Sequence, residues 1–399
     1  MASKVCFLGG GRYTRPLDAT SAKKFRALSL LGEIFVVGFS ASLELRMFTE
    51  DARFYLLPKL PLAVLRYIEM FMIAPPLVLW LIFRHGVQVL VAQSPFEGFA
   101  AALVKKIARW FGYRVALVVE SHGDFEESLF MQRSVVFPGL YRLAMLHAAR
   151  FALKHADSFR VISDSTKEQM ERWVPGRRII QFPTWTDIEV FLKAGLKKTQ
   201  SAHGQEILYT GVLIPRKGIH HLINAFASVS KDFPKTHLLI LGHEENKTYA
   251  AQLKEQVKRQ GLDERVKFIG AMPQAELATW MRRASVFVLP SLSEGLGRVV
   301  VEAMASGTPA IGSNVGGIPE MVQDGVTGFL IPPGDETMLA EKIRWVLENP
   351  DKTREMGHHA NAFAERFFSM KVYITGYKQI LEVAQHILAE DGENAPSPL

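Results

Sequence analysis

Two glutamates and a glycine-containing turn near residue 300 are the residues of this sequence best placed to do chemistry. Glu294 and Glu302 are separated by seven residues, and Gly295 and Gly297 flank Leu296 just after the first of them. A helix that begins after such a turn offers free N–H groups and the positive end of its dipole, which attract an anion such as a phosphate. A carboxylate can accept hydrogen bonds from two neighbouring hydroxyls, as a ribose diol offers. The pattern therefore predicts a site for a ligand that carries both phosphate and hydroxyl groups.

The residues around the turn predict a strand, a loop and a helix, in that order. The apolar run 286–290 is short and rich in β-branched residues, as a buried strand is. The following helix is expected to begin near Gly297 and to end at Ser306, because Gly307 supplies a stop. Glu302 then lies little more than one turn into the helix, so both acids could face one crevice.

Spacing alone would also suit a solvated helix with two surface acids, but a longer stretch favours the ligand site. The gap-free segment from Glu294 to Asp335 resembles the signature of retaining glycosyltransferase family 4, whose members have the GT-B fold and a Glu-x7-Glu motif. The resemblance implies that Glu294 is catalytic and lies beside the donor sugar, while Glu302 holds the ribose hydroxyls. It further implies that loop amides contact the diphosphate and that the base lies by the loop after another strand. The donor-binding residues implied there are Gly295, Leu296, Gly297, Arg298 and Val299 in the turn, and Met272 in the base loop.

A basic loop follows the first strand expected in the second half of the chain. In family 4 this loop usually begins Gly-Arg and ends Lys-Gly, and its two cations neutralise the diphosphate. Lys217, followed by Gly218, matches the lysine, but Val212 stands where the arginine is expected. Three interpretations remain open: Arg216 has taken over the second charge, Arg298 supplies it from the helix, or the charge is absent.

Two features of the first half are candidates for a functional site. The strand expected over 115–120 is followed closely by His122, a position from which a side chain reaches a crevice between domains. Family 4 enzymes often carry an active-site histidine at this strand end, so the resemblance implies that His122 is catalytic and contacts the donor sugar. Gly9, Gly10 and Gly11 follow the strand expected over 4–8, and are predicted to form an acceptor-side glycine loop.

The composition is that of an ordinary globular protein with room for two domains. The chain has 399 residues, of which 48% are apolar and 22% charged. The single cysteine, Cys6, excludes an internal disulfide and fits a reducing cytoplasm. The sequence has neither a zinc-type Cys/His spacing nor an Asp-x-Asp motif, and the resemblance implies a reaction without metal or bound cofactor.

The excess positive charge lies entirely in the first half. Residues 1–190 contain 24 Lys+Arg and 17 Asp+Glu, whereas residues 191–399 contain 23 of each. Because no nucleic-acid-binding signature accompanies this charge, it favours an anionic acceptor or membrane surface as the partner. The uncharged run Met70–Phe83 is too short to span a bilayer and contains Pro75-Pro76. It predicts a buried helix of the first domain, the alternative being a segment that lies on a membrane.

Strands and helices alternate in both halves of the chain, which predicts an α/β protein. The expected architecture is GT-B, with two Rossmann-like parallel-sheet domains facing a central cleft. Residues 1–185 are expected to form the acceptor-side domain, 186–203 a polar linker, 204–368 the nucleotide-sugar-binding domain, and 369–399 a helix that returns to the first domain and ends in a disordered tail.

These features predict a retaining glycosyltransferase of the hexosyltransferase type, with a nucleotide-diphosphate sugar as donor. A glycan or a membrane glycolipid of the cell envelope is the expected acceptor, and the expected location is cytoplasmic, peripheral on the inner face of the membrane. Three alternatives remain. A GT-B nucleotide-sugar epimerase shares the fold, a non-catalytic nucleotide-sugar-binding protein would explain Val212, and a nicotinamide-dependent epimerase would need a dinucleotide loop that the sequence lacks.

Overall fold

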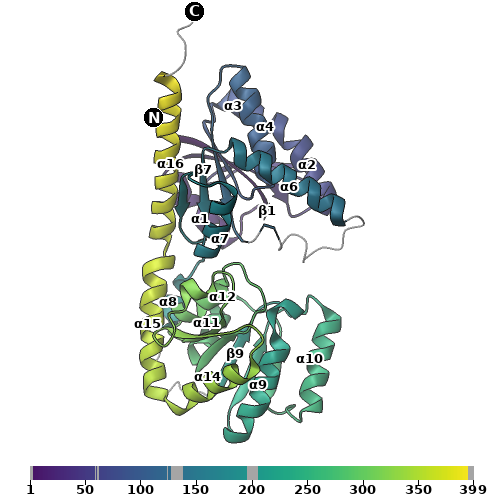
Figure 1. Ribbon diagram of the computed structural model, residues 1–399, viewed down its shortest axis with the longest axis vertical. Helices are drawn as coiled ribbons and strands as arrows, with labels where there is room; N and C mark the ends of the chain where they lie inside the picture. Colours follow the sequence, from purple (N-terminus) through teal and green to yellow (C-terminus); the bar gives the residue numbers. More distant parts are fainter. Residues whose placement is uncertain are drawn as a thin grey trace, which may run out of the picture. The chain divides into compact units, whose positions relative to one another are not determined.

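The computed structural model contains two compact units, shown in Figure 1. Unit 1 comprises Met1–Pro183 and Tyr373–Leu399, and unit 2 comprises Thr184–Val372. Each unit holds a mainly parallel sheet between layers of helices, as the alternating pattern predicted. The structure describes residues 3–58, 60, 63–123, 125–126, 138–195 and 205–393.

Unit 1 is organised around an eight-stranded sheet with the order β3-β4-β2-β1-β5-β6-β7-β8. Its strands pair in parallel except at one edge, where β3 and β4 are antiparallel. The direction of strand succession reverses between β1 and β5, and in open sheets of this kind ligands bind beyond the carboxyl ends of the strands at such a reversal. The strands are β1 Ser3–Tyr13, β2 Gly32–Ser40, β3 Arg46–Thr49, β4 Arg53–Leu57, β5 Val89–Ala92, β6 Ala116–Ser121, β7 Ser158–Val161 and β8 Ile179–Gln181.

Helices cover both faces of this sheet. One face packs against α2 Ala63–Met72, α3 Ala74–His85, α4 Glu97–Trp110, α6 Pro138–His155 and α7 Asp164–Trp173. The other face receives α1 Ala19–Ser29 and the last helix, α16 Met370–Glu393, where the Phe7 and Tyr377 rings lie 5.5 Å apart between centroids. The final helix therefore packs within the first unit from Tyr373 onward, as expected. The predicted tail beyond Glu393 lies outside the described residues.

Unit 2 contains a six-stranded, fully parallel sheet with the order β11-β10-β9-β12-β13-β14. Its central strands are apolar and buried on both faces, as expected for a parallel sheet between helix layers. The strand order reverses between β9 and β12. The strands are β9 Glu206–Thr210, β10 His237–Leu241, β11 Val266–Ile269, β12 Val286–Leu289, β13 Ala310–Ser313 and β14 Gly328–Ile331.

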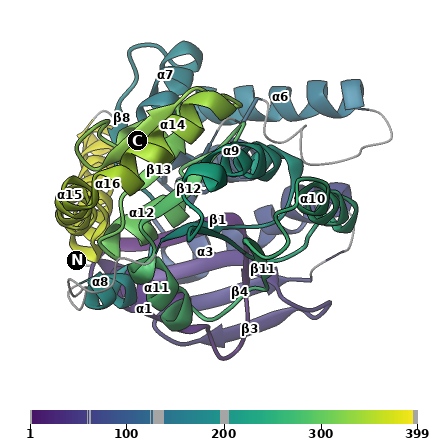
Figure 2. The same cartoon turned by 90° about the horizontal axis from the view of Figure 1, so that it is seen from below.

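The helices of unit 2 form two layers, which Figure 2 shows on either side of the sheet. One layer contains α9 Ile219–Asp232, α10 Lys247–Arg259 and α14 Glu336–Glu348. The other contains α8 Glu189–Gly195, α11 Gln274–Arg283, α12 Arg298–Ala305 and α15 Pro350–Phe368. The short helix α13, Ile318–Met321, packs against α12 and β13.

The predicted glycine loop at the start of the chain is wrong. Strand β1 continues through Gly9, Gly10 and Gly11, and its residues Arg12 and Tyr13 pair with β2. The pairing register shifts between Leu8 and Arg12, so the glycines form an irregular part of the strand. Glycine is common at such bulges because the backbone there bends away from regular strand geometry.

The predicted polar linker also contains regular structure. Within 186–203, helix α8 packs against α11, α12 and α15, and Phe191 is fully buried. Burial of apolar side chains here, with Trp185 and Ile188 just before the helix, attaches it to unit 2 in spite of its lysine-rich surroundings. Residues 196–204 lie outside the described residues.

The apolar run Met70–Phe83 forms parts of two helices instead of one buried helix. Helix α2 ends at Met72 and α3 begins at Ala74, with Pro75 and Pro76 in its first turn. Proline in the first turn is compatible with a helix because the N–H it lacks has no partner there anyway. One side of α3 is in the core, whereas Ile73, Trp80 and Phe83 are exposed.

Candidate active site

Most of the residues predicted to bind the donor lie on two loops of unit 2 that leave neighbouring parallel strands. One loop follows β9 and the other follows β12, the two strands between which the sheet order reverses. The backbone N–H of Leu292 donates to the carbonyl of Arg216 at 2.8 Å, which connects the loops. Both loops that the sequence analysis singled out therefore lie where open α/β sheets bind ligands, beyond the carboxyl ends of the strands at a reversal of strand order.

The loop after β9 turns sharply just before helix α9. Residues Pro215–Lys217 form a single 3-10 turn, and Gly218 follows with φ of 65°. A Cβ atom on Gly218 would collide with the carbonyl oxygen of Pro290. Glycine is needed here both for the left-handed backbone and for the close approach of the second loop.

The two cations of this turn converge on Glu294. Lys217 Nζ forms an ion pair with Glu294 Oε2, and both side chains are 11% exposed. Arg216 donates from a guanidinium nitrogen to the carbonyl of Ser293 at 2.9 Å and lies 3.9 Å from Glu294 Oε1. Ser291 Oγ also donates to Glu294 Oε2, at 3.2 Å. The adjacent side chains of Arg216 and Lys217 thus act on the same carboxylate, since the tight turn removes the divergence typical of an extended loop.

Close backbone contacts hold the turn between Glu294 and α12. The N–H of Gly317 donates to the carbonyl of Gly295 at 2.7 Å, and a Cβ atom on Gly316 would collide with the carbonyl oxygen of Glu294. Leu296 is buried beneath the turn. These contacts fix the loop before a ligand binds, which is the pre-organisation that anion binding by backbone amides requires.

Helix α12 begins directly after this turn, with Gly297 at its N-cap in the left-handed region (φ 72°). Arg298 and Val299 are its first residues, so their N–H groups have no acceptor within the helix. Arg298 is exposed, whereas Val299 is partly buried. The start of α12 therefore offers two backbone donors and one mobile cation to an anion.

Glu302 lies in the second turn of α12 and is partly buried. Among the residues that the structure describes, none hydrogen-bonds to its carboxylate or forms an ion pair with it. Burial raises the pKa of Glu302 to about 7, although Arg298 acts in the opposite direction. Because no described residue donates to it, the ionised form of this carboxyl has its full acceptor capacity available for hydroxyl donors.

The remaining donor residue, Met272, lies in the loop between β11 and α11 and is partly exposed. Strands β11 and β12 are parallel members of one sheet, so this loop leaves the same edge as the turn that holds Glu294. Val212, in the loop after β9, accepts a hydrogen bond from the Tyr209 hydroxyl through its carbonyl at 3.1 Å.

In unit 1, His122 lies just past β6 with its side chain 34% exposed. Its Nε2 is 2.8 Å from Oε2 of Glu120, which is 1% exposed. The other oxygen of Glu120 accepts from the Tyr377 hydroxyl at 2.7 Å and from Arg160 at 3.1 Å. Glu120 and Arg160 are direct neighbours on β6 and β7. The histidine is therefore held by a buried cluster that includes the last helix.

Burial and the neighbouring groups shift the pKa values of Glu120 and His122 in opposite directions. Burial alone would raise the pKa of Glu120, but Arg160 and the hydrogen bond from His122 hold it well below its ordinary value. Burial lowers the pKa of His122, while its hydrogen bond to Glu120 acts in the opposite direction. Glu120 is thus an anion within the protein, and the hydrogen bond at Nε2 fixes the orientation of the His122 ring.

Sequence reasoning missed Glu120, Arg160 and Tyr377. The signal for the first two was a charged residue inside an otherwise apolar strand, in 115–120 and again in 158–161. Charged residues are almost never fully buried unless they are paired, so two such positions on neighbouring strands predict an ion pair. Tyr377 lies more than 200 positions away in sequence from both partners, and no local pattern marks it.

Gly9, Gly10 and Gly11 occupy the carboxyl-side part of β1, next to the strand reversal of unit 1. A Cβ atom on Gly9 would collide with the side chain of Gln93, and one on Gly11 would lie 2.7 Å from the Tyr13 hydroxyl. Their acceptor-side role stays a prediction. Within the described residues, no group of three or more His, Cys, Asp and Glu side chains could hold a metal ion.

Comparisons with known protein families match the two halves of the chain separately. Residues 32–190 match the family model described as Glycosyltransferase Family 4, and residues 196–363 match the one described as Glycosyl transferases group 1. The chain is 32% identical over 193 residues to a glycogen synthase of Mycobacterium tuberculosis, a match that covers 48% of this chain and 45% of that protein.

A second curated relative is the phosphatidyl-myo-inositol mannosyltransferase of Mycobacterium leprae. It is 31% identical over 209 residues, which are 52% of this chain and 54% of that protein. The chain spans about half the length of the curated relatives it matches.

Solved structures with the same fold cover nearly the whole chain. A sucrose-phosphate synthase from Thermosynechococcus elongatus has a TM-score of 0.74 at 22% identity, covering 97% of this chain and all of that one. The Anabaena protein HepE, in complex with UDP, has a TM-score of 0.71 at 22% identity and covers 96% of this chain and all of that one. Both family models, the Glu-x7-Glu turn and the two parallel-sheet units lead to one conclusion: the chain belongs to glycosyltransferase family 4 and has the GT-B fold.

Proposed function

We propose that this protein is a retaining glycosyltransferase whose unit 2 binds a nucleotide-diphosphate sugar. The observation that carries the proposal is the convergence of Arg216 and Lys217 on Glu294, beside the start of α12. It provides cations, backbone donors and a carboxylate at one edge of a parallel sheet, which are the groups that a sugar diphosphate requires.

Each part of the donor then has a partner in unit 2. The ribose diol donates to the carboxylate of Glu302, which has no partner of its own among the described residues. The diphosphate lies against the N–H groups that begin α12 and against Lys217, whose ion pair with Glu294 it partly replaces. Glu294 then contacts the donor sugar, and the loop at Met272 contacts the base.

The proposed reaction is a front-face displacement at the anomeric carbon. The bond from that carbon to the diphosphate oxygen breaks, and the acceptor oxygen bonds to the same face of the sugar, so the configuration is retained. The proton of the acceptor hydroxyl passes to the departing phosphate. Charge therefore accumulates on the leaving group, and its stabilisation by Lys217, Arg216 or Arg298 and the amides of α12 is the main catalytic contribution, without a metal ion.

His122 is proposed to contact the donor sugar from unit 1. Its hydrogen bond to Glu120 through Nε2 holds the imidazole ring in one orientation. Glu120 acts through His122 and is a positioning residue.

The comparisons guide the choice of donor and acceptor to test. HepE is described in complexes with UDP and with UDP-glucose, so UDP-sugars are the first donors to examine. One curated relative is named a glycogen synthase and another a phosphatidyl-myo-inositol mannosyltransferase, and we propose a glycan or a membrane glycolipid as the acceptor here.

The first experiment screens UDP-, GDP- and ADP-sugars by thermal shift, because a ligand that binds the folded state raises its stability. Donor turnover is then measured with and without candidate acceptors, in the presence of a chelator. Transfer that depends on acceptor and survives the chelator supports the proposal. Release of free nucleotide with no acceptor would indicate a nucleotide-sugar epimerase, and binding without any turnover would indicate a non-catalytic protein.

A further inference from the structure

Unit 1 exposes a cluster of aromatic side chains where α3 and α4 end. Trp110 is 86% exposed and Phe111 63%, and the partly exposed ring of Phe83 joins them. The Phe83 centroid lies 5.7 Å from that of Phe111 and 4.8 Å from that of Tyr113. Isolated apolar side chains are normal on a protein surface, but a contiguous group of large aromatics marks an interaction site.

The helices beside this cluster are apolar on their outer side as well. Ala74, Val78 and Leu81 of α3 are buried in the core, whereas Met72 and Trp80 are exposed. The stretch Arg66–His85 has 20 residues and a mean hydropathy of 1.5, enough by length and composition to cross a membrane, and 39% of it is buried. Because its inner side belongs to the core of unit 1, this segment is suited to lie on a membrane instead of crossing it.

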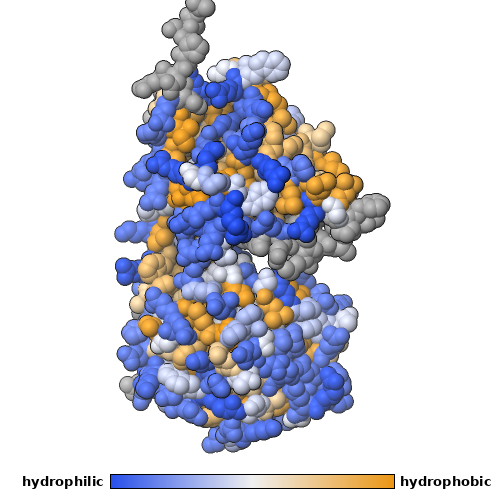
Figure 3. All heavy atoms as spheres, viewed as in Figure 1, coloured by the Kyte–Doolittle hydropathy of each residue, from blue (hydrophilic) through white to orange (hydrophobic). Residues whose placement is uncertain are grey.

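Positive charge surrounds the exposed apolar residues. Helices α3, α4 and α6 contain one acidic residue, Glu97, which is buried. The same helices contain seven basic residues: Arg84, Lys105, Lys106, Arg109, Arg142, Arg150 and Lys154. Figure 3 shows apolar side chains at the surface of this part of unit 1, with hydrophilic ones between them. Lys105 is paired with Asp157, but the basic residues of these helices far outnumber their acids, so the surface combines aromatic anchors with an excess of positive charge.

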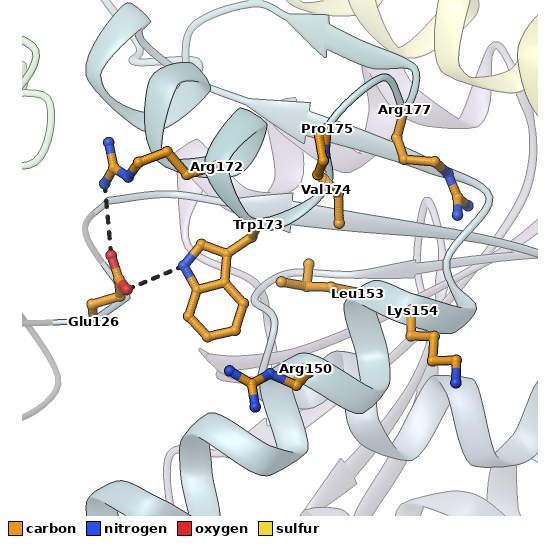
Figure 4. A pocket seen from close by; sticks show the side chains of 9 residues that line it. All are labelled: Glu126, Arg150, Leu153, Lys154, Arg172, Trp173, Val174, Pro175 and Arg177. Carbon is orange, nitrogen blue, oxygen red and sulfur yellow. Dashed lines mark hydrogen bonds and ion pairs between the residues drawn. The ribbon is translucent and has the colours of Figure 1, made fainter.

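A basic pocket continues this surface from α6 to the end of α7. It has a volume of about 650 Å³, and Figure 4 shows Arg150 and Lys154 reaching it from one side and Arg177 from the other. Trp173 lines it and donates from its indole nitrogen to Glu126 at 3.1 Å. Glu126 is the one acid among the lining residues, and it lies 3.7 Å from Arg172, a fourth cation. The pocket can therefore accept the phosphate of a lipid headgroup.

Helix α4 packs against both α3 and α6, the helices that carry parts of the aromatic cluster and of the basic pocket. Lys106 of α4 lies 5.7 Å above the ring of Phe151 in α6, and Phe151 packs against Phe99 of α4. We name the exposed side of α3, α4 and α6 the aromatic–basic face, defined by Trp80, Phe83, Arg84, Lys106, Arg109, Trp110, Phe111, Tyr113, Arg150 and Lys154.

We propose that unit 1 binds an anionic lipid bilayer through the aromatic–basic face. Aromatic rings are favoured at the level of the headgroups, and lysines and arginines are attracted by the negative surface potential of an anionic leaflet. A protein partner of ordinary surface charge would leave this many cations unpaired, whereas anionic headgroups pair with all of them. The inference concerns attachment and is independent of the reaction proposed for unit 2.

Flotation of the full-length protein with lipid vesicles tests the inference. At low ionic strength the protein should float with vesicles that contain phosphatidylglycerol and remain unbound with pure phosphatidylcholine. Raising the salt should release most of it, because screening shortens the reach of exposed charges to about 8 Å at physiological ionic strength. No flotation with phosphatidylglycerol vesicles at low salt would overturn the proposal.

Matched variants locate the surface that binds. The double variant Trp110→Ser/Phe111→Ser should reduce the vesicle-bound fraction several-fold, whereas Phe367→Ser, at an exposed phenylalanine of unit 2, should not. Lys106→Gln/Arg109→Gln should reduce binding, while Lys258→Gln/Arg259→Gln, which removes the same charge from exposed positions of α10, should have no effect. An equal loss of vesicle binding in both charge variants would show that binding depends only on the net charge of the protein, and would contradict a defined binding face.

Measuring the molecular mass of the protein in solution tests whether the aromatic–basic face instead binds a second copy of the chain. The protein without vesicles should have the same mass with and without the Trp110→Ser/Phe111→Ser change. A dimer that this change dissociates would show that the face joins two copies of the chain, and the lipid proposal would be wrong. Donor turnover in solution should be unchanged in all four variants, because none of the altered residues lies in the donor site.

Discussion

The two units hold carboxylates of opposite character, Glu120 in unit 1 and Glu302 in unit 2. Glu120 is buried and has three partners, Arg160, His122 and Tyr377, and its pKa is held low despite burial. Glu302 is partly buried and has no partner among the described residues, so burial raises its pKa to about 7. The pKa values of the two carboxyls are therefore shifted in opposite directions, because the protein supplies a cation and hydrogen-bond donors to Glu120 but not to Glu302.

This difference separates a carboxylate used for structure from one that we propose binds a ligand. The partners of Glu120 come from a neighbouring strand, a strand end and the last helix, so its charge joins distant parts of unit 1. An unpartnered acid such as Glu302 costs stability, and that cost is offset only when hydroxyl donors arrive. Glu294 is intermediate, because it has partners in Lys217 and Arg216 yet follows β12 at the edge of the sheet where we propose that the donor binds.

The largest expected effect is on the stability of unit 1. Glu120→Ala leaves Arg160 as an unpaired buried cation, which typically costs about 3–5 kcal/mol. A loss of this size should lower the unfolding midpoint of unit 1 by on the order of 10 °C, measured by differential scanning calorimetry. Glu302→Ala is the matched control and should leave the midpoint of unit 2 unchanged or raise it. Equal destabilisation by both variants would remove the distinction between the two carboxylates.

The next largest effect is expected for the cations around Glu294, the intermediate carboxylate. Val212 stands where family 4 usually has an arginine, so a second cation is expected to come from elsewhere. Removing one group that stabilises transition-state charge costs about 10²-fold or more in turnover, and Lys217→Ala should show this with little change in unfolding midpoint. Arg216→Ala should cost nearly as much, and Val212→Arg should partly restore it. A silent Arg216→Ala beside a strongly impaired Arg298→Ala would assign the second charge to α12. A large loss of stability in Lys217→Ala would instead show that its ion pair with Glu294 stabilises the fold, as the ion pair of Glu120 with Arg160 does.

The smallest expected effect is on nucleotide affinity and its dependence on pH. Glu302→Ala should weaken nucleotide binding by about tenfold, because it removes a charged acceptor of hydrogen bonds, whereas Glu294→Ala should affect turnover more than affinity. Isothermal titration calorimetry of both variants measures this, and equal losses of affinity would contradict the roles assigned to the two acids.

The raised pKa of Glu302 also predicts how stability and nucleotide affinity change with pH. Its pKa is raised from the ordinary value of 4.5 to about 7, so between these values it is protonated when folded and ionised when unfolded. Stability should therefore fall as pH rises through this window, and Glu302→Gln should flatten that part of the curve. Nucleotide affinity should rise over the same range, because the ribose hydroxyls donate best to the ionised carboxylate. An affinity that is independent of pH would show that Glu302 does not contact the ribose.

Local patterns in the sequence were enough to predict the fold class and the donor turn. The strands of a parallel sheet are short apolar runs, and the turn after β12 is marked by glycines whose backbone conformation or close contacts exclude a side chain. For the same reason Glu294 and the start of α12 could be named in advance, whereas Lys217 was named from the resemblance to family 4. These features depend on a few consecutive residues, and such residues interact whatever the rest of the chain does.

Only the tertiary structure decided how residues far apart in sequence combine. The turn at Gly218 directs both Arg216 and Lys217 to Glu294, 77 positions or more along the chain, which no reading of the loop alone could show. The pairing of β1 with β2 turned an expected glycine loop into strand, and Phe191 attached an expected linker to unit 2. Tyr377 reaches Glu120 across 257 positions, and the apolar side chains of α3 divide between core and surface. The physical reason is common to all of them: burial, ion pairing and exposure are properties of neighbours in space, and the chain defines those neighbours only when it has folded.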